Sequence, residues 1–296
     1  MKKILVTGAT GHLGSRAMDL LLKRVDPRSL SVLVRDPARA QYLETRGVKV
    51  FKGDYSDYGS LVHAFRGIEM LYFISSNTLT ERRLHHENVV GAAREAGVNH
   101  IVYTSFQRKS EDGSSPVQFL LDAHLHTEQL IRDSGIAYTI LKHGLYAEFI
   151  PVYTGDNVLE TGTIYLPAGN GRAAFTFRDD LAEGGVAVLT GEGHENKSYE
   201  FYAGKTYSFG DIADMLSDNK GKKITYVSPS PEEFRKTMTK AGVPDMVTEM
   251  NIGTAEAIRM GEFDRHDDTL RNIIGRECID ITAILDAYKA RVELLR

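Results

Sequence analysis

Three glycines near the amino terminus have the spacing of a loop that binds a phosphate group. Gly8, Gly11 and Gly14 follow an apolar run at residues 4–6 and precede an expected helix at residues 13–23. Glycine carries no Cβ, so its backbone can approach a pyrophosphate, and the first amides of the next helix point at that anion. The first gap is one residue longer than in the standard dinucleotide-binding pattern, but the strand–turn–helix context is the required one. The alternative is a tight turn without a ligand.

We therefore predict a dinucleotide site on this loop, and the residues after the second apolar run bear on which dinucleotide it takes. The expected loop contacts are Gly8, Thr10, Gly11, His12, Leu13 and Gly14. An acidic residue about 20 positions beyond the glycines would bind the ribose hydroxyls of NAD. Here Arg35 comes first and Asp36 second. The planar guanidinium of Arg35 suits a 2′-phosphate, so the sequence favours NADP, while Asp36 leaves NAD open.

Polar side chains also follow three further apolar runs. They are Asp54 and Tyr55, then Ser75 and Ser76, then Thr104, Ser105 and Phe106. The carboxyl ends of parallel strands form the edge at which open α/β sheets bind ligands. We expect the three groups to lie near the adenine, the middle of the cofactor and the nicotinamide, respectively. The alternative is that they are ordinary turn residues.

These side chains meet only if the apolar runs form one sheet. Runs without polar interruption suit strands that are buried on both faces. The runs are 4–6, 31–34, 48–51, 70–74, 101–103 and 137–141, with helices expected at 13–23, 87–96 and 122–133. The alternation predicts an α/β fold with a Rossmann-type, doubly wound parallel sheet.

The pattern changes after residue 146. Gly and Pro are frequent at residues 151–171, as in loops, while a helix at 179–189 and a strand at 199–201 indicate a return to the sheet. Capping boxes beginning at Ser208 and Ser230 predict two more helices, and a helical stripe spans residues 281–295. We divide the chain into a core at 1–150 and a mixed segment at 151–296. That segment returns to the core at about 175–205 and forms a small, mainly helical substrate lobe.

Composition excludes several classes of function. The chain has 296 residues, with 36 basic and 40 acidic side chains and a net charge of −4, so it lacks the positive field that holds nucleic acid. No apolar run approaches the roughly 18 residues of a membrane helix. The single cysteine, Cys278, excludes an internal disulfide framework. His85, His86, His124 and His126 present no recognised set of metal ligands. We expect a cytoplasmic protein without a metal.

Longer stretches resemble one known family, the NmrA-like group of atypical short-chain dehydrogenases/reductases. The similarity is greatest to its bacterial quinone and dye reductases. The matching stretches, in order, are VTGATGHLG, LVRDPARA, GDYSD, FISS, HENVVGAAREAGVNHIVYTS, HLHTEQLIRDSGIAYTILKHGLY and EGHENKSYE. They span nearly the whole chain. The resemblance implies a Rossmann core, a small C-terminal substrate lobe and a cleft between them.

One departure from the wider superfamily bears on mechanism. Most short-chain dehydrogenases use a Tyr-x-x-x-Lys pair on a helix, and the only such pair here, Tyr138 and Lys142, falls in an expected strand. Four residues of a strand span roughly 13 Å, so the two side chains cannot meet. Hydride addition to a quinone gives a delocalised anion that needs no strong acid, unlike the alkoxide from a simple ketone. The missing pair therefore favours an NADPH-dependent reductase of quinones or similar conjugated acceptors, and disfavours an alcohol dehydrogenase or sugar epimerase.

The resemblance also points to the acceptor pocket. Tyr146 matches a tyrosine of the resembled reductases, whereas His143 stands where they carry asparagine. We expect Tyr146 to stack on or hydrogen-bond the acceptor, and His143 to act as a proton donor with an ordinary pKa of about 6.5. Phe106 would form an aromatic wall. His124 and Glu128 share a helix face and would orient each other near the nicotinamide, or else form a surface ion pair.

Two further alternatives remain open at this stage. The NmrA protein itself resembles this chain and binds a dinucleotide as a regulator, so a non-catalytic sensor that binds a protein partner is the second hypothesis. The stripe at 281–295 is either core or the interface of a homodimer.

Overall fold

Seven parallel strands form the central sheet of the computed structural model, which describes residues 2–78, 80–155, 157–217 and 223–286. Their order across the sheet is β3-β2-β1-β4-β5-β6-β9. The strands are β1 (Ile4–Thr7), β2 (Leu30–Val34), β3 (Lys49–Lys52), β4 (Met70–Phe73), β5 (His100–Phe106), β6 (Ala137–His143) and β9 (Lys197–Phe201). The direction of winding reverses between β1 and β4, where such sheets bind dinucleotides. The expected doubly wound Rossmann-type fold is confirmed.

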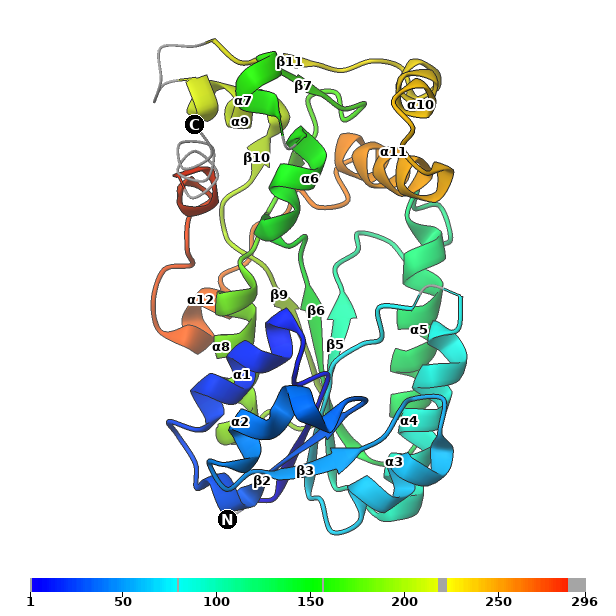
Figure 1. Ribbon diagram of the computed structural model, residues 1–296, viewed down its shortest axis with the longest axis vertical. Helices are drawn as coiled ribbons and strands as arrows, with labels where there is room; N and C mark the ends of the chain where they lie inside the picture. The colour runs from blue at the N-terminus through cyan, green and yellow to red at the C-terminus, as the bar shows by residue number, and fades with distance from the viewer. Residues whose placement is uncertain (1, 79, 156, 218–222, 287–296) are drawn as a thin grey trace.

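Helices cover both faces of the sheet (Figure 1). Because alternate residues of a strand face opposite sides, Ile4 and Val6 pack on one layer and Leu5 on the other. The first layer contains α1 (His12–Leu21), α8 (Arg178–Thr190) and α12 (Thr269–Ile274), and the second contains α3 (Tyr58–Phe65), α4 (Arg82–Ala96) and α5 (Gln118–Asp133). Short helical turns lie at η1 (Pro27–Ser29), η2 (Pro37–Ala40) and α2 (Gln41–Glu44).

The third strand departs from the sequence expectation. Every residue of β1, β2 and β4 is buried, but β3 is an edge strand in which Lys49 and Lys52 are exposed. The expectation that this run is buried on both faces is therefore wrong. Lysines on an edge strand discourage pairing with another chain.

A second group of elements lies over the carboxyl edge of the sheet, at the end marked by the arrowheads of β5 and β6 (Figure 1). Its helical elements are η3 (Ala147–Phe149), α6 (Ile150–Thr154), α7 (Val158–Thr161), α9 (Phe209–Ser217), α10 (Pro231–Lys240) and α11 (Asp245–Arg259). Two small sheets join them, an antiparallel pair of β8 (Arg172–Ala173) with β10 (Tyr207–Ser208) and a parallel pair of β7 (Thr163–Tyr165) with β11 (Thr225–Val227). We call this group the C-terminal lobe.

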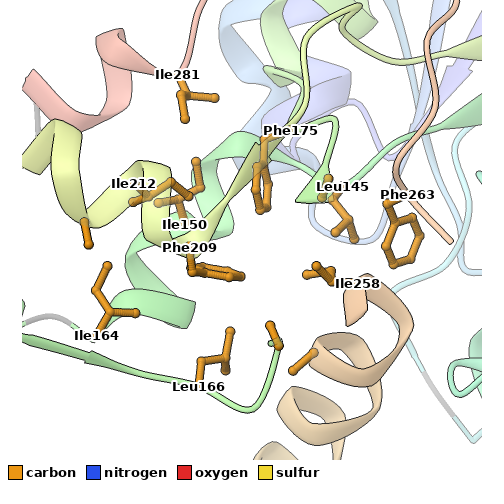
Figure 2. Close-up of a cluster of buried hydrophobic side chains, with 14 of the residues drawn as sticks. Leu145, Ile150, Ile164, Leu166, Phe175, Phe209, Ile212, Ile258, Phe263 and Ile281 are labelled. Atoms are coloured by element: carbon orange, nitrogen blue, oxygen red, sulfur yellow. The ribbon is translucent and has the colours of Figure 1, made fainter. Parts of the chain in front are cut away.

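The C-terminal lobe has its own apolar core. Phe175, Phe209, Ile212 and Phe263 converge in it from separate segments (Figure 2). The loops expected at residues 151–171 are instead the short helices α6 and α7 and the strand β7, so that expectation is wrong. The division of the chain at residue 150 stays a prediction.

Both predicted capping boxes in the lobe are present. Ser230 accepts from the Glu233 amide while the Glu233 carboxylate accepts from the Ser230 amide, and Ser208 and Asp211 exchange the same two bonds. The helical stripe falls partly outside the described residues; within them, Ile281, Ile284 and Leu285 pack on the lobe core.

Cys278, the only cysteine, is partly buried beside the layer that contains α8. Burial raises the pKa of its thiol to about 12. Among the helices of the described ranges, none has the length and apolar character needed to span a membrane.

Candidate functional site: polar groups at the carboxyl edge of the sheet

The glycine loop joins β1 to α1 in a conformation that excludes larger residues. Gly8 has a φ of +62°, and a Cβ on Gly14 would lie 2.2 Å from the Gly8 carbonyl oxygen. The first residue before α1 is Gly11, which supplies no capping side chain, and the first turn holds no acid. The positive end of α1 is therefore left for an external anion. These features fit the pyrophosphate of a dinucleotide.

Two arginines lie beside this loop. Arg35 follows β2, is exposed and has no ion pair within the described ranges, whereas Arg39 Nη2 donates to the Thr10 carbonyl at 3.3 Å. Asp36 accepts from the Ala38 amide through Oδ1 at 3.0 Å, as the N-cap of η2. Sequence reasoning missed Arg39; the second arginine of LVRDPARA was the available signal. The structure thus brings a second guanidinium to the side expected to meet the ribose phosphate.

The polar residues at the next strand ends bond to one another. Tyr55 donates its hydroxyl to the Ile74 carbonyl at 2.8 Å, and the Ser75 amide donates to Thr104 Oγ1 at 2.9 Å. Asp54 accepts from the Ser56 amide, and that hydrogen bond lowers the pKa of Asp54. The ends of β3, β4 and β5 are therefore fixed relative to one another. The assignment of these residues to parts of a cofactor stays a prediction.

A buried polar cluster lies behind that edge. His86 Nε2 accepts from the Ser76 amide at 3.0 Å while its Nδ1 lies 2.7 Å from Thr127 Oγ1. Tyr103 Oη lies 2.8 Å from His124 Nδ1. Burial lowers the pKa of His86 to about 3, and it lowers the pKa of His124 as well. Both imidazoles are therefore neutral at neutral pH.

His124 and Glu128 do not orient each other, although both lie on α5. Glu128 is fully buried and binds Arg108 through two bonds, Nη1 to Oε1 at 2.8 Å and Nη2 to Oε2 at 2.9 Å. Ser105 also donates to Glu128. Burial tends to raise the pKa of Glu128, but the bonds from Arg108 hold it below its usual value. Both sequence interpretations of the pair, mutual orientation and a surface ion pair, are wrong because Arg108 binds the carboxylate.

Sequence reasoning also missed Arg108, which joins the sheet to the lobe. Its carbonyl accepts from Arg265 Nη1 at 3.2 Å, and the amide of the next residue, Lys109, donates to Glu262 at 2.9 Å. Arg265 and Glu262 lie more than a hundred residues after Arg108 in the sequence. No local sequence pattern could therefore have predicted this connection.

His143 lies at the end of β6 with an exposed fraction of 1%. Its ring is stacked against Phe201, and its Nδ1 lies 3.5 Å from the Tyr146 hydroxyl. Burial lowers the pKa of His143 to about 3. The expectation of an ordinary pKa is therefore wrong, and an imidazolium that donates a proton is not present at neutral pH. Its Nε2 is buried without a hydrogen-bond partner among the described residues.

Gln107 lies beside His143 and was also missed. The two residues are joined by a bond from the Gln107 amide to the His143 carbonyl at 2.9 Å. Both polar atoms of the Gln107 side chain are buried, and no partner for them exists in the described part of the protein. Unsatisfied buried polar groups are costly, so Gln107 and His143 are candidates to bind a polar group of a ligand.

Tyr146 is held in an aromatic stack. Its ring lies parallel to Phe149, and the Arg178 guanidinium lies over it at 4.9 Å. Burial raises the pKa of Tyr146 to about 12. Tyr146 is therefore suited to stacking and hydrogen bonding. Across the described ranges, no three His, Cys, Asp or Glu side chains are grouped so as to hold a metal ion.

Comparisons with known proteins agree with this geometry. The profile of the NmrA-like family matches residues 1–289. Quinone oxidoreductase 2 of Escherichia coli (strain K12) is 36% identical over 276 residues, which cover 92% of this chain and 93% of the relative. The crystal structure of the NADPH-dependent quinone oxidoreductase of Escherichia coli with NADPH aligns with a TM-score of 0.90 at 33% identity, covering 96% of this chain and 99% of that one. Triphenylmethane reductase of Citrobacter sp., complexed with NADP(H), aligns with a TM-score of 0.88 at 36% identity and the same coverage.

The Arg108–Glu128 pair should contribute strongly to stability. Arg108→Met leaves a buried carboxylate with only Arg132 as a cation, and we expect the free energy of unfolding to fall by about 3–5 kcal/mol in urea titrations. Arg108→Met with Glu128→Leu should recover most of that loss, because no buried charge remains and the former partners Arg132 and Glu111 reach solvent. Arg235→Met, which breaks the exposed pair with Glu249, should cost about 1 kcal/mol or less. Equal losses for the two single variants would contradict this assignment.

His143 should make the protein sensitive to acid. The unfolded chain binds a proton near pH 6.5 and the folded chain only near pH 3, so stability is present above pH 6.5 and is lost as the pH falls towards 3. For this one group we expect a loss of about 2 kcal/mol between about pH 7 and pH 5. His143→Asn should reduce the loss by that amount in urea titrations at both pH values. An unaltered loss in His143→Asn would refute the prediction.

Proposed function

The chain belongs to the NmrA-like family, and on that premise we propose that it is an NADPH-dependent reductase of quinones or similar conjugated acceptors. The observation that carries the proposal is the uncapped start of α1 behind the Gly8–Gly14 turn. An anion-binding turn at the first strand of a doubly wound sheet is typical of a dinucleotide-binding protein. The similar proteins, which include an NADPH-dependent quinone oxidoreductase, support the choice of reaction.

The groups around the turn support NADP over NAD. Arg35 and Arg39 would bind the 2′-phosphate, with His12 as a third contact, while Asp36 already caps its own loop through Oδ1. The remaining expected cofactor contacts are those at the ends of β3, β4 and β5. When bound, the reduced nicotinamide supplies the hydride.

The acceptor side of the site suits a flat conjugated molecule. Tyr146 and Phe106 contribute aromatic rings, and the unpartnered polar atoms of Gln107 and His143 lie buried behind them. The side chains position the acceptor and exclude water, and the rate gain comes mainly from proximity. The only Tyr-x-x-x-Lys pair lies on β6, where Lys142 binds Glu200 at 3.1 Å. That arrangement supports a reaction without the usual acid. We regard small-molecule acceptors as the partners; a cytoplasmic location and a homodimer stay predictions.

Cofactor oxidation at 340 nm tests the proposal. The purified chain is mixed with NADPH or NADH and with a benzoquinone, a naphthoquinone or a cationic triphenylmethane dye, and the uncatalysed rate is subtracted. We expect turnover with NADPH. Tight NADPH binding by calorimetry without turnover on any acceptor would contradict the reductase and favour the regulator.

Arg35 should discriminate between the two cofactors. We expect Arg35→Asp to weaken NADPH binding far more than NADH binding, because the carboxylate repels a 2′-phosphate and can bond a ribose hydroxyl. Calorimetric titrations of both cofactors measure the difference. Arg66→Asp makes the same change of charge at an exposed position after α3 and should leave both affinities unchanged. Equal losses for NADPH and NADH in Arg35→Asp would refute the role.

A further inference from the structure

Arg82 has a charge that the described fold does not neutralise. It lies in the first turn of α4, and its side chain is partly buried. Its Nε is fully buried without a hydrogen-bond partner, and no carboxylate in the described ranges pairs with the guanidinium. Arg108, which also lies at this edge, differs because it binds two glutamates. A partly buried cation without a counter-ion is costly, so an external anion is the expected partner.

The groups around Arg82 belong to the acceptor side of the site. Arg82 lies one turn before His86 on α4, and the His86 ring packs edge-on against the rings of Tyr103 and His124. The charge of Arg82 also acts on Tyr103 and Tyr146, whose hydroxyls burial keeps protonated. It also acts on His86 and His124, which burial keeps neutral. All four are uncharged at neutral pH, and the charge of Arg82 acts on each of them. Arg178 acts on Tyr146 and Arg108 on His124 as well, but these two cations are paired with Glu148 and Glu128, respectively. Tyr146 in turn lies within 3.5 Å of His143.

We propose that Arg82 binds the oxygen of the acceptor that becomes negatively charged, and that it thereby selects acceptors whose reduction produces an anion. The inference rests on the proposed function. One hydride, carrying two electrons, passes to a quinone; the reduced nicotinamide becomes oxidised, the quinone becomes the hydroquinone monoanion, and a proton from water completes the hydroquinone. A guanidinium aimed at the oxygen stabilises that anion as it develops. A cationic dye is instead neutralised by hydride, so the same charge does not favour its reduction.

The first experiment compares two acceptors in one variant. In Arg82→Gln we expect kcat/KM for a benzoquinone to fall about 100-fold, while kcat/KM for a cationic triphenylmethane dye stays the same or rises. Arg82→Lys should recover part of the quinone activity, because lysine keeps the positive charge but lacks the paired N–H donors of the planar guanidinium. Arg83→Gln is the matched control, since Arg83 is exposed on the next position and contacts His126; it should change neither activity.

Two results of that experiment would overturn the inference. An equal loss with both acceptors would mean that Arg82 supports the fold. A comparable loss of NADPH affinity, measured by calorimetry, would mean that it binds the cofactor instead. Thermal unfolding followed by circular dichroism identifies a variant that does not fold, in which case Arg82→Lys is compared with the wild type.

A second experiment does not depend on turnover and so separates the two proposals. A nitrophenol is bound to the protein together with NADP⁺, and its ionisation is followed by the visible absorbance of the anion. The wild type should lower the pKa of the bound phenol by about 1–3 units, as a nearby opposite charge does, and Arg82→Gln should abolish that shift. The same pKa in both proteins, or no saturable binding to the wild type, would overturn the inference even if the chain reduces quinones. A shift that depends on Arg82 would support it even if no acceptor is turned over.

Discussion

The buried ion pair between Arg108 and Glu128 is the interaction on which the arrangement of the site depends. A carboxylate at the centre of α5 is stable there only because a guanidinium binds both of its oxygens. Ser105 on β5 donates its hydroxyl to Glu128 of the same pair. The Arg108 carbonyl accepts from Arg265, and the Lys109 amide donates to Glu262, so the pair is also bonded to the lobe. The sheet edge, one covering helix and the lobe are therefore tied together at a single polar cluster.

Burial determines the electrostatic character of the acceptor side. Removal of water disfavours every charged form, so the histidines are neutral and the tyrosines remain protonated. Glu128 keeps its charge because Arg108 binds it. Arg82 differs, because no carboxylate among the described residues binds it. The result is a largely aromatic group of neutral side chains beside which Arg82 has no bound carboxylate among the described residues. Such a site is suited to hydride transfer, because the acceptor needs orientation and the product needs only local stabilisation of an anion.

Local sequence patterns were sufficient for the sheet and the glycine loop. The apolar runs, the glycine spacing and the serine caps each depend on neighbours within a few residues, so the Rossmann-type fold and both capping boxes could be predicted. The pKa of His143 could not, because it depends on how completely Phe201 and the lobe exclude water. The partner of Glu128 could not either, since Arg108 lies 20 residues away and on a loop without periodicity. The exposure of β3 could not be predicted either, because it follows from the position of β3 at the edge of the sheet. The apolar run of one strand does not contain the order of the strands.

Cys278 has a chemical consequence for a protein of this proposed activity. Quinones are electrophiles that form covalent adducts with thiolates, and many proteins are inactivated in that way. Only the deprotonated sulfur reacts, and a thiol whose pKa is raised to about 12 is almost entirely protonated at neutral pH. The chain has no other cysteine. Its one thiol is thereby protected from arylation by the compounds that the proposed activity would require the protein to meet.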